Sequence, residues 1–195
     1  MKSETEFLGP ILDGIDKNHG RKLRNIARTA IRSQLSGMRY KPRISDPMLH
    51  EKAGIFVTLE NQGEMRGCIG FVYPTYELWA AAKKAAIHAA YQDPRFRPVR
   101  RDELETLEVE ISVIGPVEKV RVKSEKDVES IKIGTHGLMV VGHGSTGLLL
   151  PQVADEMELT PVEFLMATCE KGGLNQDSWR NRDISVYRFP VKVFR

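Results

Sequence analysis

The sequence predicts an α+β protein with a largely antiparallel sheet, and three observations support that class. Two hairpin patterns, at residues 54–71 and 137–150, are each followed by a proline and then by a helix, which makes a weak internal repeat. Two further segments, 107–115 and 184–194, alternate apolar and polar residues as half-buried strands do. An amphipathic pattern over residues 17–35 adds a helix.

Length and composition are those of an ordinary globular protein. The chain has 195 residues, of which 41% are hydrophobic and 28% are charged. We therefore expect a single domain over residues 1–195, with possible lobes at about 1–106 and 107–195. Residues 1–16 are interpreted as an N-terminal extension.

The two cysteines, Cys68 and Cys169, lie far apart in the sequence and have neither disulfide-framework nor zinc-ligand spacing. We expect no metal, no cofactor and a reducing, cytoplasmic location. The N-terminus lacks the apolar core of a signal peptide. The longest uncharged run, 133–154, is rich in glycine, so a buried hairpin is expected there and no membrane span.

The helix predicted over residues 17–35 ends before Gly37, and its apolar residues recur at helical spacing. Its arginines fall largely on the opposite side, at Arg21, Arg24, Arg28 and Arg32. A solvated face is favoured over a nucleic-acid or membrane surface, because no aromatic residues that would stack on bases interleave with these arginines.

The first hairpin joins a strand at 54–60 to the run MRGCIGF, Met65–Phe71, through a three-residue turn that ends in glycine and fits a bulge. Thr75 is the expected N-cap of the following helix, which runs to about Tyr91.

Within MRGCIGF, Arg66 and Cys68 point to the same face of the strand. A cation two residues from a thiol favours the thiolate, the form that acts as a nucleophile. Gly67 and Gly70 weaken a strand, which suggests that something approaches this backbone closely.

The loop Gln92–Val99 contains two prolines, which would hold the residues between them in fixed positions. In a purely structural reading, Asp93 forms a turn and Arg95 pairs with a carboxylate. In a functional reading, Arg95 clamps an anionic ligand. The structural role is favoured.

The second half of the chain repeats the plan of the first. A short strand at 117–122 and a helix from Ser124 precede the second hairpin. A later helix has a complete start at Thr160, with proline and glutamate following, and stops at Gly172. Cys169 lies within that helix and is most simply a small core residue.

The ordered motifs MRGCIGF, DPRF, IGTHGL, GLLLPQVA and KGGL closely resemble the AMMECR family, named for the Alport syndrome, midface hypoplasia and elliptocytosis chromosomal region. The resemblance covers about Leu23 to Phe194. It implies a three-layer α/β/α fold with a mainly antiparallel sheet built from two related halves. The resemblance implies no particular biochemical activity, because the family has no settled one. For prokaryotic members it implies association with a Memo-like protein and a radical SAM enzyme. Members resemble one another most in the run that matches residues 66–70.

Three functions remain open, and the sequence does not decide whether the protein is an enzyme. In the first, a binding or regulatory module uses Arg66, Gly67, Gly70, Asp93 and Arg95 to hold a small anionic ligand or a protein partner. In the second, the basic helix binds nucleic acid, which is the weaker reading.

The third reading is a cysteine enzyme, in which Cys68 is the nucleophile and His136 carries the proton. The glycines beside Cys68 would leave backbone N–H groups free for an oxyanion. Each assignment has a structural alternative: Cys68 would be a small strand residue, and His136 would cap a turn. Metal binding by Cys68, His136 and His143 lacks a compact motif and is a weak alternative.

Overall fold

The computed structural model describes residues 9–122 and 124–195. The described chain divides into two compact units. The N-terminal unit contains residues 9–115 together with 192–195, and the C-terminal unit contains residues 116–191. The last strand therefore contributes residues to both units.

The N-terminal unit holds eight elements within its described residues. They are α1 (Gly9–Gly14), α2 (Lys17–Leu35), η2 (Pro47–His50), β1 (Gly54–Asn61), β2 (Glu64–Phe71), α3 (Leu78–Tyr91), η3 (Arg101–Glu103) and β3 (Leu107–Ile114).

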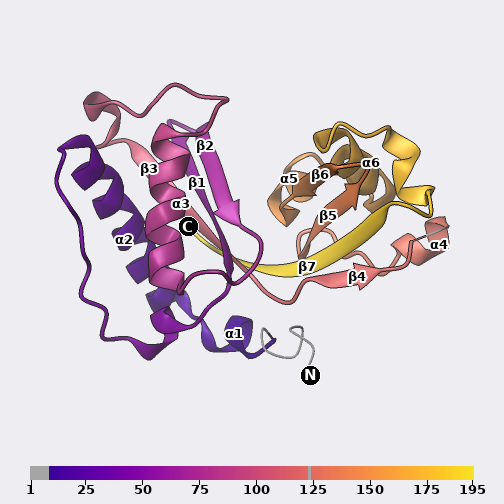
Figure 1. Cartoon of the computed structure of the whole chain (residues 1–195), viewed down its shortest axis with the longest axis horizontal. Coiled ribbons are helices and arrows are strands. Elements are labelled where there is room, and N and C mark those ends of the chain that lie inside the picture. The colour runs from indigo at the N-terminus through magenta and orange to yellow at the C-terminus, as the bar shows by residue number, and fades with distance from the viewer. Residues whose placement is uncertain (1–8, 123) are drawn as a thin grey trace. The chain divides into compact units, whose positions relative to one another are not determined.

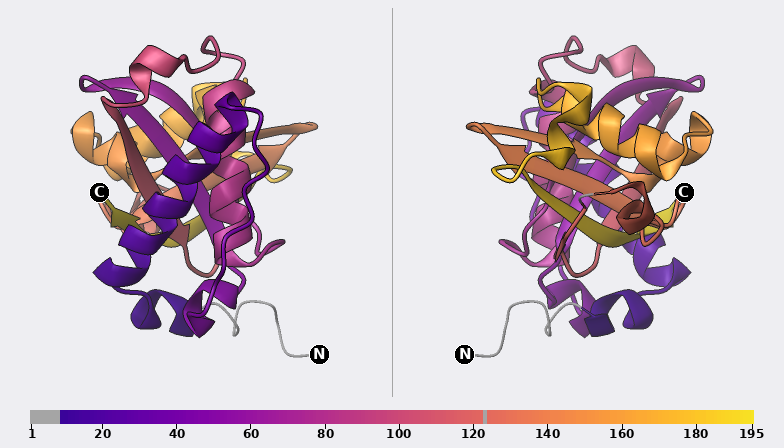
Figure 2. Two further views of the ribbon diagram at one scale, coloured as in Figure 1. Left: turned by 90° about the vertical axis from the view of Figure 1, so that its left-hand side faces the viewer. Right: turned by 90° about the vertical axis from the view of Figure 1, so that its right-hand side faces the viewer.

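In this unit β1 lies between β2 and β3 and pairs antiparallel with both (Figure 1). Helices α2 and α3 lie side by side over one face of these strands (Figure 2). Val57, Ile69 and Ile111 share that face and join the core beneath the helices. The first hairpin is confirmed, but two residues join its strands instead of the predicted three, and the register shifts between Leu59 and Glu60 rather than in the turn.

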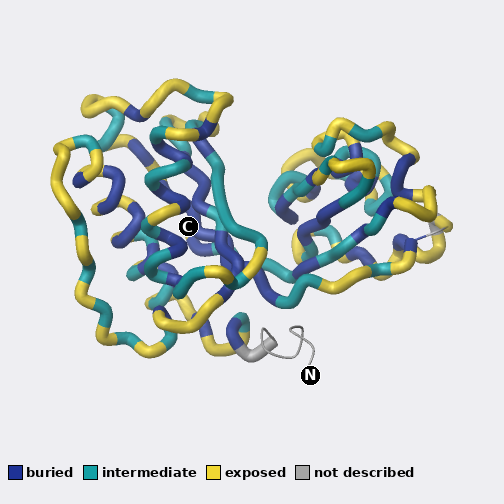
Figure 3. The backbone as a smooth tube through the Cα atoms, in the orientation of Figure 1, coloured by how far each residue is buried: buried dark blue, intermediate teal, exposed yellow. Residues whose placement is uncertain are grey.

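Local sequence explains where the helices of this unit begin and end. Asp16 caps α2 through the backbone N–H groups of Asn18 and His19, and the helix has the predicted bounds. Helix α3 begins at Leu78, after Glu77, so the predicted N-cap at Thr75 is wrong. All the alanines of α3 except Ala80 are buried, which allows its backbone to lie close to β2 (Figure 3).

The structure describes residues 9–16 of the predicted N-terminal extension, and residues 1–8 lie outside the described part. Helix α1 was not predicted. Ile11 and Ile15 are buried in the core of the N-terminal unit, which ties this segment to the fold.

The C-terminal unit contains β4 to β7 and the helices between them. Its elements are β4 (Glu118–Val120), α4 (Glu125–Val128), β5 (His136–Gly142), β6 (Ser145–Leu149), α5 (Pro151–Glu156), α6 (Pro161–Lys171), η4 (Gln176–Arg180) and β7 (Ser185–Phe194). Strand β7 pairs antiparallel with β4 and β5, and β5 pairs with β6. The α+β class with an antiparallel sheet is confirmed.

Two glycines show the same contact in the two units. A Cβ at Gly67 on β2 would overlap the carbonyl oxygen of Ala89 on α3. A Cβ at Gly147 on β6 would overlap the carbonyl oxygen of Thr168 on α6. In each unit a glycine on the second strand of the hairpin thus lets the backbone of the following helix pack closely against that strand. This shared contact gives the weak internal repeat a physical basis.

None of the helices in the described part of the chain combines the length and apolar character that crossing a bilayer requires.

Candidate functional site

Cys68 lies on β2, the outermost strand of the N-terminal unit's sheet. Thr58 is its partner on β1, and Glu110 is the partner of Thr58 on β3. These three side chains form one row on the face opposite the helices. Thr58 Oγ1 donates a hydrogen bond to Cys68 Sγ at 3.3 Å, and Glu110 is paired with Arg195 at 2.6 Å.

The loop after α3 covers the outer edge of β2 at Cys68. Asp93 Oδ2 accepts a hydrogen bond from the Cys68 backbone N–H at 2.9 Å. Arg95 Nη2 donates to the Cys68 carbonyl at 3.2 Å and to Asp93 Oδ2 at 2.7 Å. The two side chains therefore satisfy the edge groups that a neighbouring strand would otherwise pair.

Asp93 and Arg95 differ in how much of each is exposed. The Asp93 side chain is 1% exposed and that of Arg95 is 42% exposed. Hydrogen bonds from Arg95 lower the pKa of the Asp93 carboxyl to about 2 against an opposing effect of burial, and the Cys68 backbone contributes as well. Asp93 is thus a buried carboxylate that orients a partly exposed guanidinium.

Arg66 binds the C-terminal part of the same loop. Its Nε donates to Glu103 Oε1 at 2.5 Å, and its Nη1 donates to the Arg97 carbonyl at 2.7 Å. Its Nη2 donates to the Pro98 carbonyl and to Glu103 Oε2. The hydrogen bonds that Arg66 donates to the Glu103 carboxylate lower its pKa, against an opposing effect of burial. The Arg66 side chain binds carbonyl groups of this loop, and the Asp93 side chain binds the backbone of β2. Both side chains therefore have structural roles.

The pKa of the Cys68 thiol is raised, chiefly because the thiol is buried. The hydrogen bond from Thr58 and the charge of Arg95 act in the opposite direction, and Asp93 and Glu110 raise the pKa further. The prediction that Arg66 favours a thiolate is therefore wrong. Arg66 is held by Glu103, and Arg95 is the cation that acts on the thiol.

The close approach predicted at Gly67 and Gly70 is confirmed, and the protein itself makes it. Gly67 receives the Ala89 carbonyl, as described above. A Cβ at Gly70 would overlap the Ile55 carbonyl oxygen and the Phe56 ring. The Cys68 backbone N–H donates a hydrogen bond to Asp93, so this donor is already satisfied and is not free to bind an oxyanion.

His136 begins β5 in the C-terminal unit. Its Nδ1 accepts a hydrogen bond from the Lys132 backbone N–H at 3.0 Å, which is the turn-capping role considered as the alternative. Burial lowers the pKa of His136, and the charges of Arg188 and Lys132 lower it further. Its pairing with Cys68, which belongs to the other unit, stays a prediction.

Part of the basic face of α2 lies near carboxylates. Arg24 and Arg28 line a pocket of about 210 Å³ together with Glu60, Glu108 and Glu110. Within the described ranges, no three His, Cys, Asp or Glu side chains gather in the geometry of a metal site.

Sequence reasoning missed Thr58 and Glu110. Alternation places both on the face away from the helices, but Thr58 is aligned with Cys68 only because the register shifts between Leu59 and Glu60, which the predicted turn did not locate. The pairing of β1 with β3 joins segments about fifty residues apart, and it carries no local signal.

Comparison with known proteins gives consistent matches over most of the chain. Residues 24–194 match the family model described as AMMECR1. A protein from Thermococcus gammatolerans is 45% identical over 182 residues, which cover 90% of this chain and 89% of the relative. A protein from Aquifex aeolicus is 38% identical over 178 residues, covering 90% and 91%.

The crystal structure of an uncharacterised protein from Pyrococcus horikoshii has the same fold. It superposes with a TM-score of 0.87 at 41% identity, and the match covers 92% of each chain.

Proposed function

We propose that this chain, which belongs to the AMMECR1 family, is a binding module rather than a cysteine enzyme, and that it receives an anionic group on the Cys68 face of the N-terminal unit. One observation carries the proposal. Asp93 orients the guanidinium of Arg95 beside a thiol whose pKa is raised. A neutral thiol next to a fixed cation suits recognition better than nucleophilic attack.

The hydrogen bonds of Arg95 indicate which part of the guanidinium meets the ligand. Its Nε and Nη2 bind Asp93 and the Cys68 carbonyl. Among the described residues, no acceptor is bound to Nη1. This nitrogen, on a side chain that is 42% exposed, is the donor available to a carboxylate or phosphate.

Alkylation of Cys68 by two related reagents tests the proposal. Neutral iodoacetamide reports how much thiolate is present, whereas iodoacetate also carries a carboxylate that an anion site attracts. We expect an apparent pKa above the reference of about 8.5. We also expect a higher rate ratio of iodoacetate to iodoacetamide than for a free thiol such as N-acetylcysteinamide, because Arg95 Nη1 can donate a hydrogen bond to the carboxylate of the reagent.

Two arginine variants control this experiment. Arg95→Gln should bring the ratio down to that of the free thiol, while Arg97→Gln, an exposed arginine of the same loop, should leave it unchanged. Cys169 is buried and serves as an unreactive internal reference in the folded protein. An apparent pKa well below 8.5 would favour the enzyme reading, and a ratio insensitive to Arg95→Gln would remove the anion site.

A protein partner bearing a carboxylate would use the same face. The association with a Memo-like protein and a radical SAM enzyme, and the cytoplasmic location, stay predictions for this chain. Titrating a purified Memo-like protein against the wild type and Arg95→Gln, with calorimetric detection, tests the first of these.

A further inference from the structure

The C-terminal unit contains a pocket of about 400 Å³ that lies outside the site described above. Its lining comes from β4, the residues that follow it, η4 and the start of β7. The inner wall is apolar and largely buried, and it is formed by Val120, Val122, Trp179, Ile184 and Val186. The exposed part is basic and is formed by Lys119, Arg121, Arg180 and Arg182. No Asp or Glu is among the lining residues.

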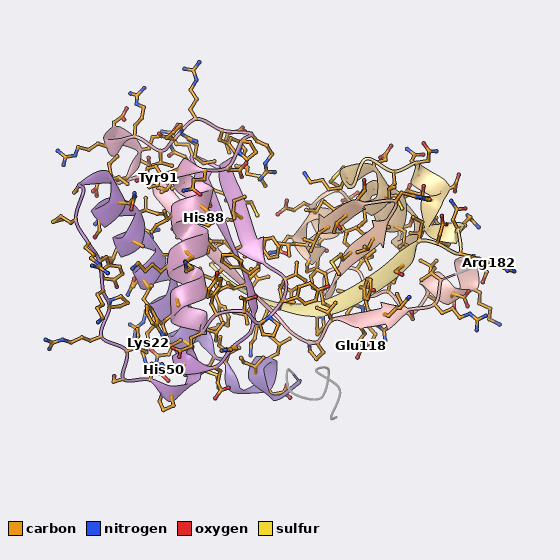
Figure 4. All side chains as sticks on the ribbon, viewed as in Figure 1. Lys22, His50, His88, Tyr91, Glu118 and Arg182 are labelled. Carbon is orange, nitrogen blue, oxygen red and sulfur yellow. The ribbon has the colours of Figure 1, made fainter. Side chains whose placement is uncertain are left out.

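Three of these cations have no acidic partner among the residues that the structure describes. In the described part of the chain, no ion pair or hydrogen bond joins a carboxylate to Lys119, Arg121 or Arg182, the last of which is labelled in Figure 4. The nearby carboxylates face other cations. Glu118 pairs with Arg188, Asp177 with Arg180 and Asp183 with His143. Positive charge from Lys119, Arg121 and Arg182 therefore collects around the pocket, whereas Arg180 has a carboxylate partner.

Trp179 supplies a second and independent observation. Its side chain is among the largest that are fully buried, with 1% of the residue exposed. Its Nε1 is buried and has no hydrogen-bond acceptor among the described residues. Buried indole N–H groups usually find a partner, so this unsatisfied donor is an unusual feature of a residue that lines the pocket. The guanidinium of Arg180 lies over the ring at 4.2 Å.

We propose that this pocket binds a phosphorylated small molecule. Several cations around one cavity suit a group with more than one negative charge, such as a phosphate or diphosphate, better than a single carboxylate. Lys119, Arg121 and Arg182 meet the phosphate oxygens, and the valine and isoleucine wall covers the less polar part of the ligand. The volume lies within the range of small-molecule sites.

Titration of the full chain with ADP and with inorganic pyrophosphate tests this proposal. Calorimetry gives the affinity and stoichiometry. Fluorescence in a Trp79→Phe background reports on Trp179 alone, because the chain has two tryptophans. We expect saturable one-to-one binding accompanied by a change in Trp179 emission.

Charge-matched variants locate the binding. Arg121→Gln and Arg182→Gln should each weaken binding by roughly tenfold, the usual effect of losing one charge-assisted hydrogen bond. Arg39→Gln removes the same charge from an exposed position in the N-terminal unit and should leave the affinity unchanged. Circular dichroism establishes that all three variants are folded.

Three results would overturn the proposal. The first is absence of binding at millimolar ADP and pyrophosphate. The second is equal weakening by Arg39→Gln, which would mean that net charge alone is responsible. The third is tighter binding of a single-stranded oligonucleotide than of ADP, lost in Arg121→Gln and Arg182→Gln, which would make this a nucleic-acid surface. The alkylation ratio at Cys68 is measured on the other unit, so failure of either proposal is distinguishable from failure of the other.

Discussion

Replacing Asp93 by asparagine should reduce the free energy of unfolding by an amount that depends on pH. The pKa of this carboxyl falls from its ordinary 3.8 to about 2, and its side chain is 1% exposed. At about 1.36 kcal/mol per pKa unit, the charged form contributes about 2 kcal/mol to stability. The asparagine side chain keeps the shape but loses the charge that holds Arg95 and the Cys68 N–H.

The sign follows from the direction of the shift. A carboxyl with a depressed folded-state pKa stabilises the fold above its unfolded pKa, and it loses that contribution as pH falls through the folded value. The difference between wild type and Asp93→Asn should therefore be about 2 kcal/mol near neutral pH and should shrink between about pH 4 and pH 2.

Urea denaturation followed by circular dichroism, at several pH values from about 7 to about 3, measures this difference. Asp13→Asn is the matched control, because Asp13 is exposed. Its difference from wild type should be small and should not change with pH. A difference for Asp93→Asn that stays constant from neutral to acid pH would refute the reasoning, because the effect would then not arise from the charge.

Two further substitutions probe the contacts around β2. Gly67→Ala should lower stability by about 1–3 kcal/mol, because its Cβ meets the Ala89 carbonyl, which is backbone and yields little. Gly14→Ala, whose Cβ meets only the end of a flexible side chain, should stay within about 1 kcal/mol of wild type by thermal denaturation, and similar losses for both would contradict this account. Arg66→Gln should cost about 2 kcal/mol, since its pair with a carboxylate is only 17% exposed on the arginine side. Arg100→Gln is the control, because it breaks an ion pair whose arginine side chain is 74% exposed. If urea denaturation shows that it lowers the free energy of unfolding as much as Arg66→Gln does, burial does not determine the loss of stability.

Much of the fold followed from local pattern. The apolar spacing of residues 17–35 predicts the bounds of α2, and the Thr160 capping box predicts the start of α6. The first hairpin follows from alternation and from the turn that ends in Gly63, whereas the position of its register shift does not. Each of these depends on residues within a few positions of one another, which is why the sequence reveals them.

The candidate site was predicted less completely. Alternation predicted that Arg66 and Cys68 share a face, and this stays a prediction because the register of β2 shifts between Met65 and Gly67. It did not indicate that the long Arg66 side chain reaches Glu103, 37 positions later. The thiol pKa was misjudged for the same reason, because burial and the position of Arg95 determine it.

The sequence by itself determined that the run around Cys68 is an unusual strand, that its glycines admit a close neighbour and that Arg95 lies in a rigid loop. Only the tertiary structure decided which atoms meet there. Alternation and capping are properties of neighbouring residues, whereas the row of Cys68, Thr58 and Glu110 exists only once three strands pair. Burial, and with it the pKa of Cys68 and the unpartnered indole of Trp179, arises from packing between segments that the chain brings together from a distance.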